Sequence, residues 1–214
     1  MNGYDRKRRR LVEKMRGKGI HDPRVLAAVA AVPRDRFVPH SIRARAYDDS
    51  ALPIGHGQTI SQPSLQALYL QVLEIGPDDR VLEVGAGSGY QTALLAEMAA
   101  NVYAVERIDE LTQRARKILD ELGYKNVALV TGDGTVGWSK YAPYDAILVA
   151  AASPDIPDAL VDQLTPGGRL LIPVGDRTTQ ELTLVKKTAE DQVERTPITQ
   201  CVFVPLIGRF GWPE

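Results

Sequence analysis

The segment 81–90 constrains the fold of this chain more than any other, because an apolar run, Val-Leu-Glu-Val, stops abruptly in Gly-Ala-Gly-Ser-Gly-Tyr. Gly85, Gly87 and Gly89 permit backbone dihedrals that other residues avoid, and they let the main chain approach a ligand without an intervening Cβ atom. A helix that begins near Gln91 would point its unpaired N–H groups into the same turn. We therefore expect a nucleotide-type cofactor site here, with an ordinary strand–helix turn as the alternative.

The spacing of the glycines indicates the kind of cofactor. A dinucleotide fingerprint, G-x-G-x-x-G, would require glycine at position 90, where this chain has Tyr90. The pattern G-x-G-x-G forms a looser turn, which suits a cofactor without phosphate, such as S-adenosylmethionine. The next strand, expected at 101–106, ends in Glu106, whose carboxylate is able to accept hydrogen bonds from both hydroxyls of a ribose. Because dinucleotide sites use an acidic residue in the same place, Glu106 alone indicates only a ribose.

A third strand, expected at 126–131, is followed by Gly132-Asp133-Gly134. Asp133 is placed to accept a hydrogen bond from an adenine amino group, although a plain Asx turn explains it as well. A glycine turn, a Glu and an Asp at three successive strand ends favour a methyltransferase-type site. The candidate cofactor-binding residues are Glu83, Gly85, Gly87, Gly89, Glu106, Asp133 and Gly134, and we expect no metal ion.

The rest of the pattern predicts one α/β domain with a doubly wound, mostly parallel sheet of the class I S-adenosylmethionine-dependent methyltransferase type. From Arg80 onward, strands are expected near 81–84, 101–106, 126–131, 144–150 and 169–174, with helices at 109–122 and 157–164. We assign residues 1–79 to an N-terminal helical and loop cap for the substrate, 80–175 to the cofactor-binding core and 176–214 to a C-terminal strand pair at 181–187 and 192–206.

Helix signals in the cap are local. Asp22 before Pro23 predicts a helix start, with Asp22 as the N-cap. A second helix is expected at 62–73, with a buried stripe formed by Leu65, Leu68, Tyr69 and Val72. In the core, Asp109 is the expected cap and Gly123 the expected stop of the helix 109–122.

Length, charge and cysteine content exclude several classes of protein. With 214 residues, the chain is long enough for one substantial domain, and its net charge of −1 argues against a general electrostatic binder of nucleic acid. The basic run 6–10 lies in an expected helix whose Leu11 and Met15 face inward, so it is either a solvated face or a patch for an acidic partner.

No apolar signal segment follows that run, and the longest apolar stretch, 146–152, is too short to span a bilayer. The single cysteine, Cys201, rules out an internal disulfide; we expect a monomeric, cytoplasmic protein.

The segment 52–61, Leu-Pro-Ile-Gly-His-Gly-Gln-Thr-Ile-Ser, resembles a binding loop more than a linker. Ser61 stands at the expected N-cap of the helix 62–73, so a capping role explains it without any function. The N–H groups of that first turn and the hydroxyls of Thr59 and Ser61 would equally form a carboxylate site. For His56 a structural role is favoured over a part in binding.

Several strings together resemble the protein-L-isoaspartate O-methyltransferase family. They are the segment 52–61, Val-Leu-Glu-Val-Gly-Ala-Gly-Ser-Gly-Tyr-Gln-Thr-Ala, Gly-Asp-Gly-Thr-Val-Gly-Trp, Ala-Pro-Tyr-Asp-Ala-Ile and Phe-Val-Pro-Leu, and the match runs from about Val32 to Leu206. Gln-Thr-Ile-Ser is highly specific to this family, whereas the glycine turn is shared by many methyltransferases. Ala86 and Ala150 stand where the family often has threonine, which leaves the fine shape of the cofactor pocket open.

The resemblance implies that the chain methylates the free α-carboxyl group of isoaspartyl residues in damaged proteins and peptides, with S-adenosylmethionine as the cofactor. The methyl ester then leads through a succinimide back to aspartate. By match to the family motif, Ser61 is the active-site serine and Thr59 lies beside it. A main-chain α-carboxyl group has a reference pKa of about 3.3–3.7 and is ionised at neutral pH, so it needs no general base. Hydroxyl donors would orient it without neutralising it.

Two other functions remain open from the residues alone. Another S-adenosylmethionine enzyme could act on nucleic acid or on a small molecule. Base amino-group methylation usually calls for an Asn/Asp-Pro-Pro-aromatic turn, and this chain has Ala-Ala-Ser-Pro at 151–154; pyrimidine methylation needs Pro-Cys, and here Cys201 follows Gln200. The other alternative is a cofactor-binding module without catalysis.

Overall fold

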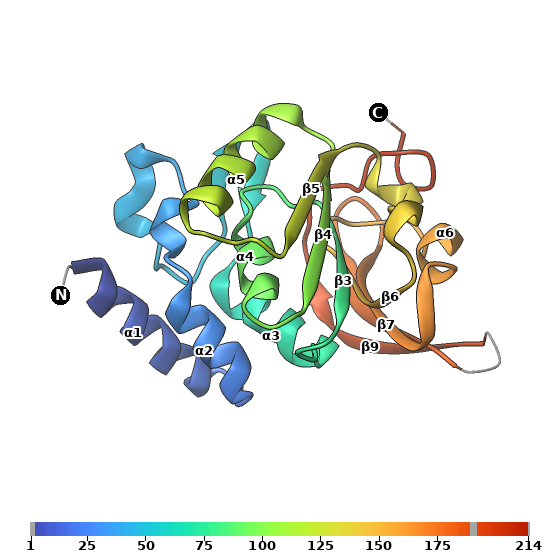
Figure 1. Cartoon of the computed structure of the whole chain (residues 1–214), viewed down its shortest axis with the longest axis horizontal. Helices are drawn as coiled ribbons and strands as arrows, with labels where there is room; N and C mark the ends of the chain where they lie inside the picture. Colours follow the sequence, from blue (N-terminus) through green and yellow to red (C-terminus); the bar gives the residue numbers. More distant parts are fainter. Residues whose placement is uncertain (1–2, 189–191, 214) are drawn as a thin grey trace.

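The computed structural model describes residues 3–188 and 192–213, and its centre is a sheet of seven strands (Figure 1). The spatial order is β5-β4-β3-β6-β7-β8-β9. Pairing is parallel from β5 across to β7 and antiparallel from β7 through β8 to β9. The strands are β3 (Arg80–Val84), β4 (Asn101–Glu106), β5 (Val127–Thr131), β6 (Tyr144–Val149), β7 (Leu164–Gly175), β8 (Gln180–Lys187) and β9 (Val193–Cys201). This arrangement confirms the predicted mostly parallel α/β sheet with a strand pair at one edge.

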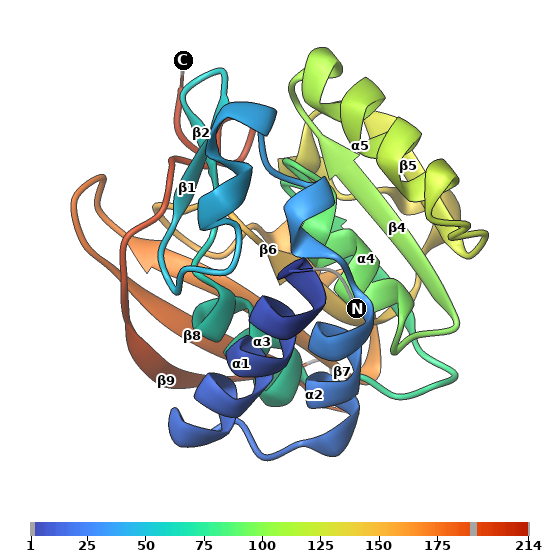
Figure 2. The same cartoon turned by 90° about the vertical axis from the view of Figure 1, so that its left-hand side faces the viewer.

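Helices cover the two faces of the sheet unequally. Five of them pack into one apolar cluster on the face that Figure 2 shows in front: α1 (Gly3–Gly17), α2 (Pro23–Ala31), α3 (Pro63–Leu73), α4 (Tyr90–Ala96) and α5 (Asp109–Glu121). Four-residue α6 (Asp158–Val161), the 3₁₀ turns η3 (Gly134–Val136) and η4 (Ser139–Tyr141) and the C-terminal segment cover the opposite face. Neighbouring residues of β3 point to opposite faces, so Val81 joins the first cluster and Leu82 the second.

Some of the predictions for the N-terminal cap, residues 1–79, are confirmed. Asp22 caps α2, since its carboxylate accepts from the backbone N–H groups of Arg24 and Val25, and Leu11 and Met15 of α1 are buried as predicted. The cap also contains η1 (Arg34–Arg36), η2 (His40–Arg45) and the hairpin of β1 (Leu52–Gly55) with β2 (Gln58–Ile60).

The predicted buried stripe of α3 is wrong in three of its four members. Of that stripe only Tyr69 is fully buried, because α3 lies between α2 and the sheet and buries Gln66, Ala67, Leu70 and Leu73 as well. Leu65, Leu68 and Val72 are half-buried at the edge of the same cluster. A helix enclosed on most sides shows too weak a periodicity to identify its innermost face.

Four boundaries differ from expectation. The helix predicted at 157–164 shrinks to α6, because Leu164 already pairs with Tyr144 as part of β7. The strand predicted to reach 206 ends at Cys201. The N-cap of α5 is Ile108 rather than Asp109, although Gly123 ends the helix with φ +85° as predicted. Ser61 does not cap α3, whose N-cap is Gln62; the carboxylate of Asp49 instead accepts from Ser64 N at 2.9 Å.

A buried arginine ties the cap to the core. Arg34 of η1 is fully buried and donates three hydrogen bonds: Nε to the carbonyl of Ala46 at 2.8 Å, Nη1 to Gln66 Oε1 at 2.7 Å and Nη2 to the carbonyl of Ser61 at 2.8 Å. Its guanidinium carbon lies 4.7 Å from the ring centroid of Tyr90. Burial lowers the pKa of Arg34 to about 10, so the group stays charged at neutral pH. One side chain thus fixes the Ser61 loop, α3 and the start of α4 against each other.

Replacing Arg34 tests this link. Arg34→Met leaves two buried acceptors and one partly buried acceptor without donors, and each loss at a buried group costs about 1–3 kcal/mol, so we expect the free energy of unfolding to fall by at least about 2 kcal/mol. Urea denaturation followed by circular dichroism measures the change. The control is Arg36→Met, because Arg36 is partly exposed and pairs with Glu121 at the surface; it should cost less than about 1 kcal/mol. Equal effects of the two variants would contradict the central role of Arg34.

Candidate active site

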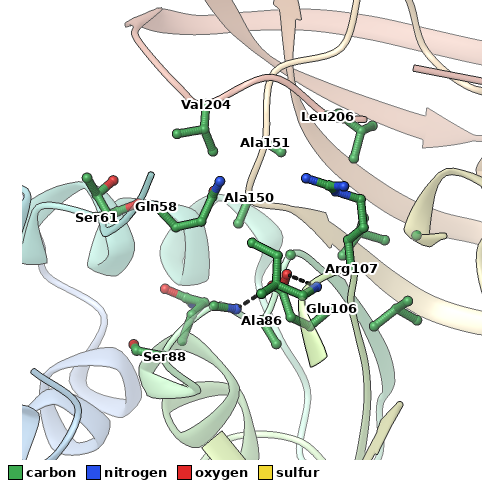
Figure 3. A pocket seen from close by; sticks show the side chains of 18 of the residues that line it. Gln58, Ser61, Ala86, Ser88, Glu106, Arg107, Ala150, Ala151, Val204 and Leu206 are labelled. Carbon is green, nitrogen blue, oxygen red and sulfur yellow. Dashed lines mark hydrogen bonds between the residues drawn. The ribbon is translucent and has the colours of Figure 1, made fainter. Parts of the chain in front are cut away.

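A cavity of about 210 Å³ lies at the carboxyl ends of β3 and β4. Gln58 and Ser61 stand on one side of it, and Glu106 and Arg107 on the other (Figure 3). The glycine turn after β3, the residues after β6 and the segment 204–207 complete the wall. That last segment reaches the site because it leaves the sheet after β9 and pairs with Ala152, which donates to the carbonyl of Val204 and accepts from Leu206 N.

The glycine turn uses left-handed backbone at each glycine, with φ +88° at Gly85, +55° at Gly87 and +84° at Gly89. Gly85 and Gly87, two of the candidate cofactor-binding residues, line the cavity. Gly89 does not. It is the N-cap of α4, and a Cβ atom there would lie 3.0 Å from the Cβ of Ala115. Its role is therefore close packing of the turn against α5.

Glu106 is positioned by two backbone donors. Oε2 accepts from Gly87 N at 2.8 Å and Oε1 from Ile108 N at 2.9 Å, the two bonds drawn as dashed lines in Figure 3. The side chain is 7% exposed and lines the cavity. A carboxylate has about four acceptor sites, so each oxygen keeps capacity for a further donor. The predicted carboxylate at the end of the second strand therefore faces the site in a fixed orientation.

Glu83 lies behind the cavity rather than in its wall. Its side chain is fully buried; Oε2 accepts from the Thr92 hydroxyl at 2.5 Å, and Oε1 has no partner in the described structure. Burial raises the pKa of Glu83 to about 8, an effect that the Thr92 bond opposes and the nearby charge of Glu106 reinforces. At neutral pH this carboxyl group is therefore mostly protonated, and it holds α4 to β3.

Asp133 is separated from the main cavity, whereas Gly134 lines it. Oδ1 of Asp133 accepts from the backbone N–H and the hydroxyl of Thr135, and Oδ2 accepts from Arg209 N at 2.8 Å. Asp133 lines a neighbouring cavity of about 300 Å³ together with Trp212. The Asx-turn interpretation thus describes its local geometry, and its bond to Arg209 holds the C-terminal segment close to the site.

Thr59 and Ser61 lie where two cavities meet. A second cavity, of about 480 Å³, adjoins the first and shares with it Thr59, Ser61, Ala150 and Val204. The Ser61 carbonyl is held by Arg34, while its hydroxyl donates no hydrogen bond within the described ranges. Since Ser61 does not cap α3, that hydroxyl is available to a ligand. His56, in contrast, is exposed in the β1–β2 turn, and neither cavity includes it.

Three glutamine residues of the cavity are absent from the candidate residues that the sequence suggested. Gln58 and Gln66 line it, and Arg34 accounts for the Gln66 orientation: it only donates, so it fixes Gln66 Oε1 toward itself and leaves Nε2 on the opposite side. Gln91 also lines the cavity, is 4% exposed, and neither atom of its amide has a partner in the described structure. An unsatisfied buried amide points to a bound polar group. Gln58 begins the Gln-Thr-Ile-Ser motif, which could have identified it, whereas no spacing in the sequence singles out Gln66 or Gln91, because they lie on separate helices.

Neither a metal site nor a membrane span emerges from the described residues. Among residues 3–188 and 192–213, His, Cys, Asp and Glu side chains do not gather in groups of three that could hold a metal ion. Within the same ranges, every helix falls short of the length and hydropathy that crossing a bilayer requires.

Comparison with known proteins gives consistent results. The family model described as protein-L-isoaspartate(D-aspartate) O-methyltransferase matches residues 6–211. A protein-L-isoaspartate O-methyltransferase of Methanoculleus marisnigri is 54% identical over 209 residues, covering 97% of this chain and 94% of the relative. A protein-L-isoaspartate O-methyltransferase 2 of Geotalea uraniireducens is 52% identical over 213 residues, covering 99% and 98%.

Solved structures agree with these relatives. A structure named protein-L-isoaspartate O-methyltransferase superposes with a TM-score of 0.87 at 29% identity, covering 95% of this chain and 67% of that one. A putative protein-L-isoaspartate O-methyltransferase of Plasmodium falciparum, in complex with S-adenosyl-L-homocysteine, has a TM-score of 0.82 at 26% identity, covering 97% and 99%.

The buried Glu83 carboxyl group predicts a pH-dependent stability. The folded protein keeps its proton up to a pKa of about 8, whereas the unfolded chain loses it near the ordinary value of 4.5. The stabilisation is complete below pH 4.5 and is lost as pH rises toward 8, with a slope of up to about 1.4 kcal/mol per pH unit. Glu83→Gln, which is neutral at every pH, should remove this slope in urea denaturation between pH 5 and 8. The exposed Glu110→Gln variant controls for loss of a carboxylate, and an unchanged slope in Glu83→Gln would refute the assignment.

Proposed function

The chain belongs to the protein-L-isoaspartate(D-aspartate) O-methyltransferase family, and from this membership we propose which of its residues carry out each part of the reaction. The enzyme (EC 2.1.1.77) transfers a methyl group from S-adenosylmethionine to the free α-carboxylate of L-isoaspartyl residues, and the ester leads through a succinimide toward repaired aspartate. The observation that supports our assignment is the meeting of two cavities at Thr59 and Ser61. One cavity suits the cofactor and the other the peptide, so donor and acceptor meet at these hydroxyl groups.

The first cavity has the groups that S-adenosylmethionine requires. Glu106 would accept from the ribose hydroxyls, since its two backbone bonds leave acceptor capacity on both oxygens. The free amide of Gln91 and Nε2 of Gln66 suit the ammonium and carboxylate groups of the methionine end, because an amide both donates and accepts. When bound, the cofactor supplies an electrophilic methyl group on its sulfonium sulfur.

The remaining predicted cofactor residues would act in two ways. Gly85, Gly87 and Gly134 let the main chain come close to the cofactor; a Cβ atom on Gly134 would lie 2.4 Å from Val84 Cγ1, so this position excludes larger residues. Glu83 and Gly89 would support the turn from behind. For Asp133 the adenine contact stays a prediction; its bonds to Thr135 and Arg209 support a positioning role for Gly134 and the C-terminal segment.

The acceptor needs orientation rather than activation. Its carboxyl group, with a reference pKa of about 3.3–3.7, is already an anion at neutral pH. Ser61 and Thr59 would donate hydrogen bonds to some lone pairs of this carboxylate and leave another lone pair facing the methyl group. A hydroxyl donor leaves the negative charge of the carboxylate in place. Arg34 holds the Ser61 main chain without reaching the acceptor, which keeps a full positive charge away from the nucleophile. Alignment of the reacting atoms and exclusion of water then account for the catalysis.

Our proposals for the cellular setting rest on the sequence. We propose isoaspartyl proteins and peptides as the partners, rather than nucleic acid or a membrane, because the net charge is −1. A monomer in the cytoplasm is consistent with the single, half-buried Cys201 thiol, whose pKa burial raises to about 11.

Glu106→Ala tests the cofactor site. Hydrogen bonds to a charged group contribute roughly 1.5–3 kcal/mol each, so the dissociation constant of S-adenosylmethionine should rise by about tenfold or more. Peptide affinity should change little. Titration calorimetry with the cofactor measures the effect, and Glu110→Ala on the exposed face of α5 is the control. Unaltered cofactor binding by the Glu106 variant would remove this residue from the site.

Ser61→Ala tests the acceptor site. Because Ser61 does not cap α3, the free energy of unfolding should change by less than about 0.5 kcal/mol. Loss of a donor to a charged acceptor should lower kcat/KM for an isoaspartyl peptide by about tenfold or more, while cofactor affinity stays the same. Ser41→Ala, at an exposed position of η2, is the matched control. If the Ser61 variant keeps the parent kcat/KM, its hydroxyl has no part in the reaction.

A further inference from the structure

The second cavity is a groove whose described lining includes one charged side chain. Starting from Thr59 and Ser61, it runs between the segment 199–204 and the side chains of Gln62 and Leu65. The other lining residues are apolar or carry neutral polar groups, so Lys18, in the turn after α1, is the one charged residue among the described residues that line it. A substrate chain that enters this groove therefore encounters one cation and no anion in its wall.

The Lys18 ammonium group is held in place rather than left mobile. Its Nζ lies 2.6 Å from Asp49 Oδ2, and this carboxylate also accepts from Ser64 N at 2.9 Å and Gln62 Nε2 at 3.2 Å. Burial opposes ionisation of Asp49, but these donors outweigh it and lower the pKa of the carboxyl group to about 2. The Asp49 side chain is 1% exposed, whereas that of Lys18 is 43% exposed. The carboxylate is thus hidden behind the wall, and the ammonium group faces solvent.

The local charge is positive because two cations share that carboxylate. Nζ of Lys14 lies 4.0 Å from the same Asp49 Oδ2, and its side chain is 53% exposed. Two ammonium groups and one carboxylate leave a net charge of +1. The neighbouring Asp48 does not cancel it, since Asp48 pairs with Arg45 at 3.4 Å. The potential at this part of the groove is therefore set by Lys18 and Lys14.

We propose that Lys18 is a specificity-determining residue that favours isoaspartyl sites with an acidic side chain a few residues away. The inference rests on the proposed function, in which the acceptor lies at Ser61. Gln62 follows Ser61 in the chain, and its side chain contacts Asp49, which contacts Lys18. Each step in this series of contacts is short, and an extended peptide advances by up to about 3.6 Å per residue, so we place the acidic side chain within about three residues of the acceptor. A Glu or Asp side chain at that separation reaches the ammonium group.

Paired peptides test the preference. In one series, Glu replaces Gln at each of the three positions before and after the isoaspartyl residue, and kcat/KM is measured for each pair at low ionic strength. For the wild-type enzyme, at least one position should favour Glu by about threefold to fivefold, the range of a partly exposed ion pair. The preference should shrink in 0.5 M salt, because screening weakens exposed charge pairs.

Variants of Lys18 separate charge from structure. We call the kcat/KM of the Glu peptide divided by that of the Gln peptide the Glu/Gln ratio. Lys18→Gln should bring this ratio to about one, Lys18→Glu should lower it below one, and Lys18→Arg should keep it near the wild-type value. The control is Lys125→Gln, which removes the same charge at an exposed site next to β5, the opposite edge of the sheet from β9. Circular dichroism confirms that each variant is folded.

The outcomes distinguish this inference from the proposed function. Methylation of the neutral peptide by the wild-type enzyme, and its loss in Ser61→Ala, test the function alone. A Glu/Gln ratio of one at all six positions would overturn the role of Lys18 while leaving the function intact. The same holds if Lys18→Gln lowers kcat/KM equally for both members of each pair, since that result would assign Lys18 a structural role or a contact with the acceptor carboxylate.

Discussion

The rest of the site depends on the hydrogen bonds that the buried guanidinium group of Arg34 donates. It connects the Ala46 and Ser61 carbonyls, the Gln66 side chain and the Tyr90 ring, which belong to the cap loop, α3 and the helix after the glycine turn. A planar group with several fixed donors meets these partners simultaneously, whereas a lysine ammonium would not. The relative position of substrate loop and cofactor turn thus follows from one desolvated cation whose donors are satisfied.

In the mechanism we propose, this anchoring takes the place of a strong base. The acceptor carboxylate is already ionised, so catalysis requires that two ligands meet at a defined distance and angle. Arg34 provides rigidity from behind the main chain, and Thr59 and Ser61 line both cavities. In the same proposal the positive charge of Arg34 stays away from the nucleophile, because Arg34 is buried behind the loop.

Local sequence patterns were reliable where one residue type decides the backbone. The left-handed glycines at 85, 87 and 89, the Asp22 cap, the Gly123 stop and the Glu106 strand end all appear as expected. Patterns failed where a distant partner competes. Ser61 looked like a cap, but Asp49 supplies the carboxylate to the first turn of α3; the strand expected to continue to 206 is instead drawn across the site by pairing with Ala152.

The sequence by itself determined the fold class, the kind of cofactor and the family, because these depend on glycine spacing, strand-end acids and a contiguous loop motif, and it supplied Thr59 and Ser61 as the hydroxyl residues of our proposal. Only the tertiary structure decided which candidates face the cavity. It placed Gly85, Gly87, Glu106 and Gly134 in the wall, left Glu83 and Gly89 behind it and Asp133 in a neighbouring cavity, and added Gln66 and Gln91 from separate helices. The physical reason is that burial and hydrogen-bond partners arise from packing between segments far apart in the chain, which local spacing does not encode.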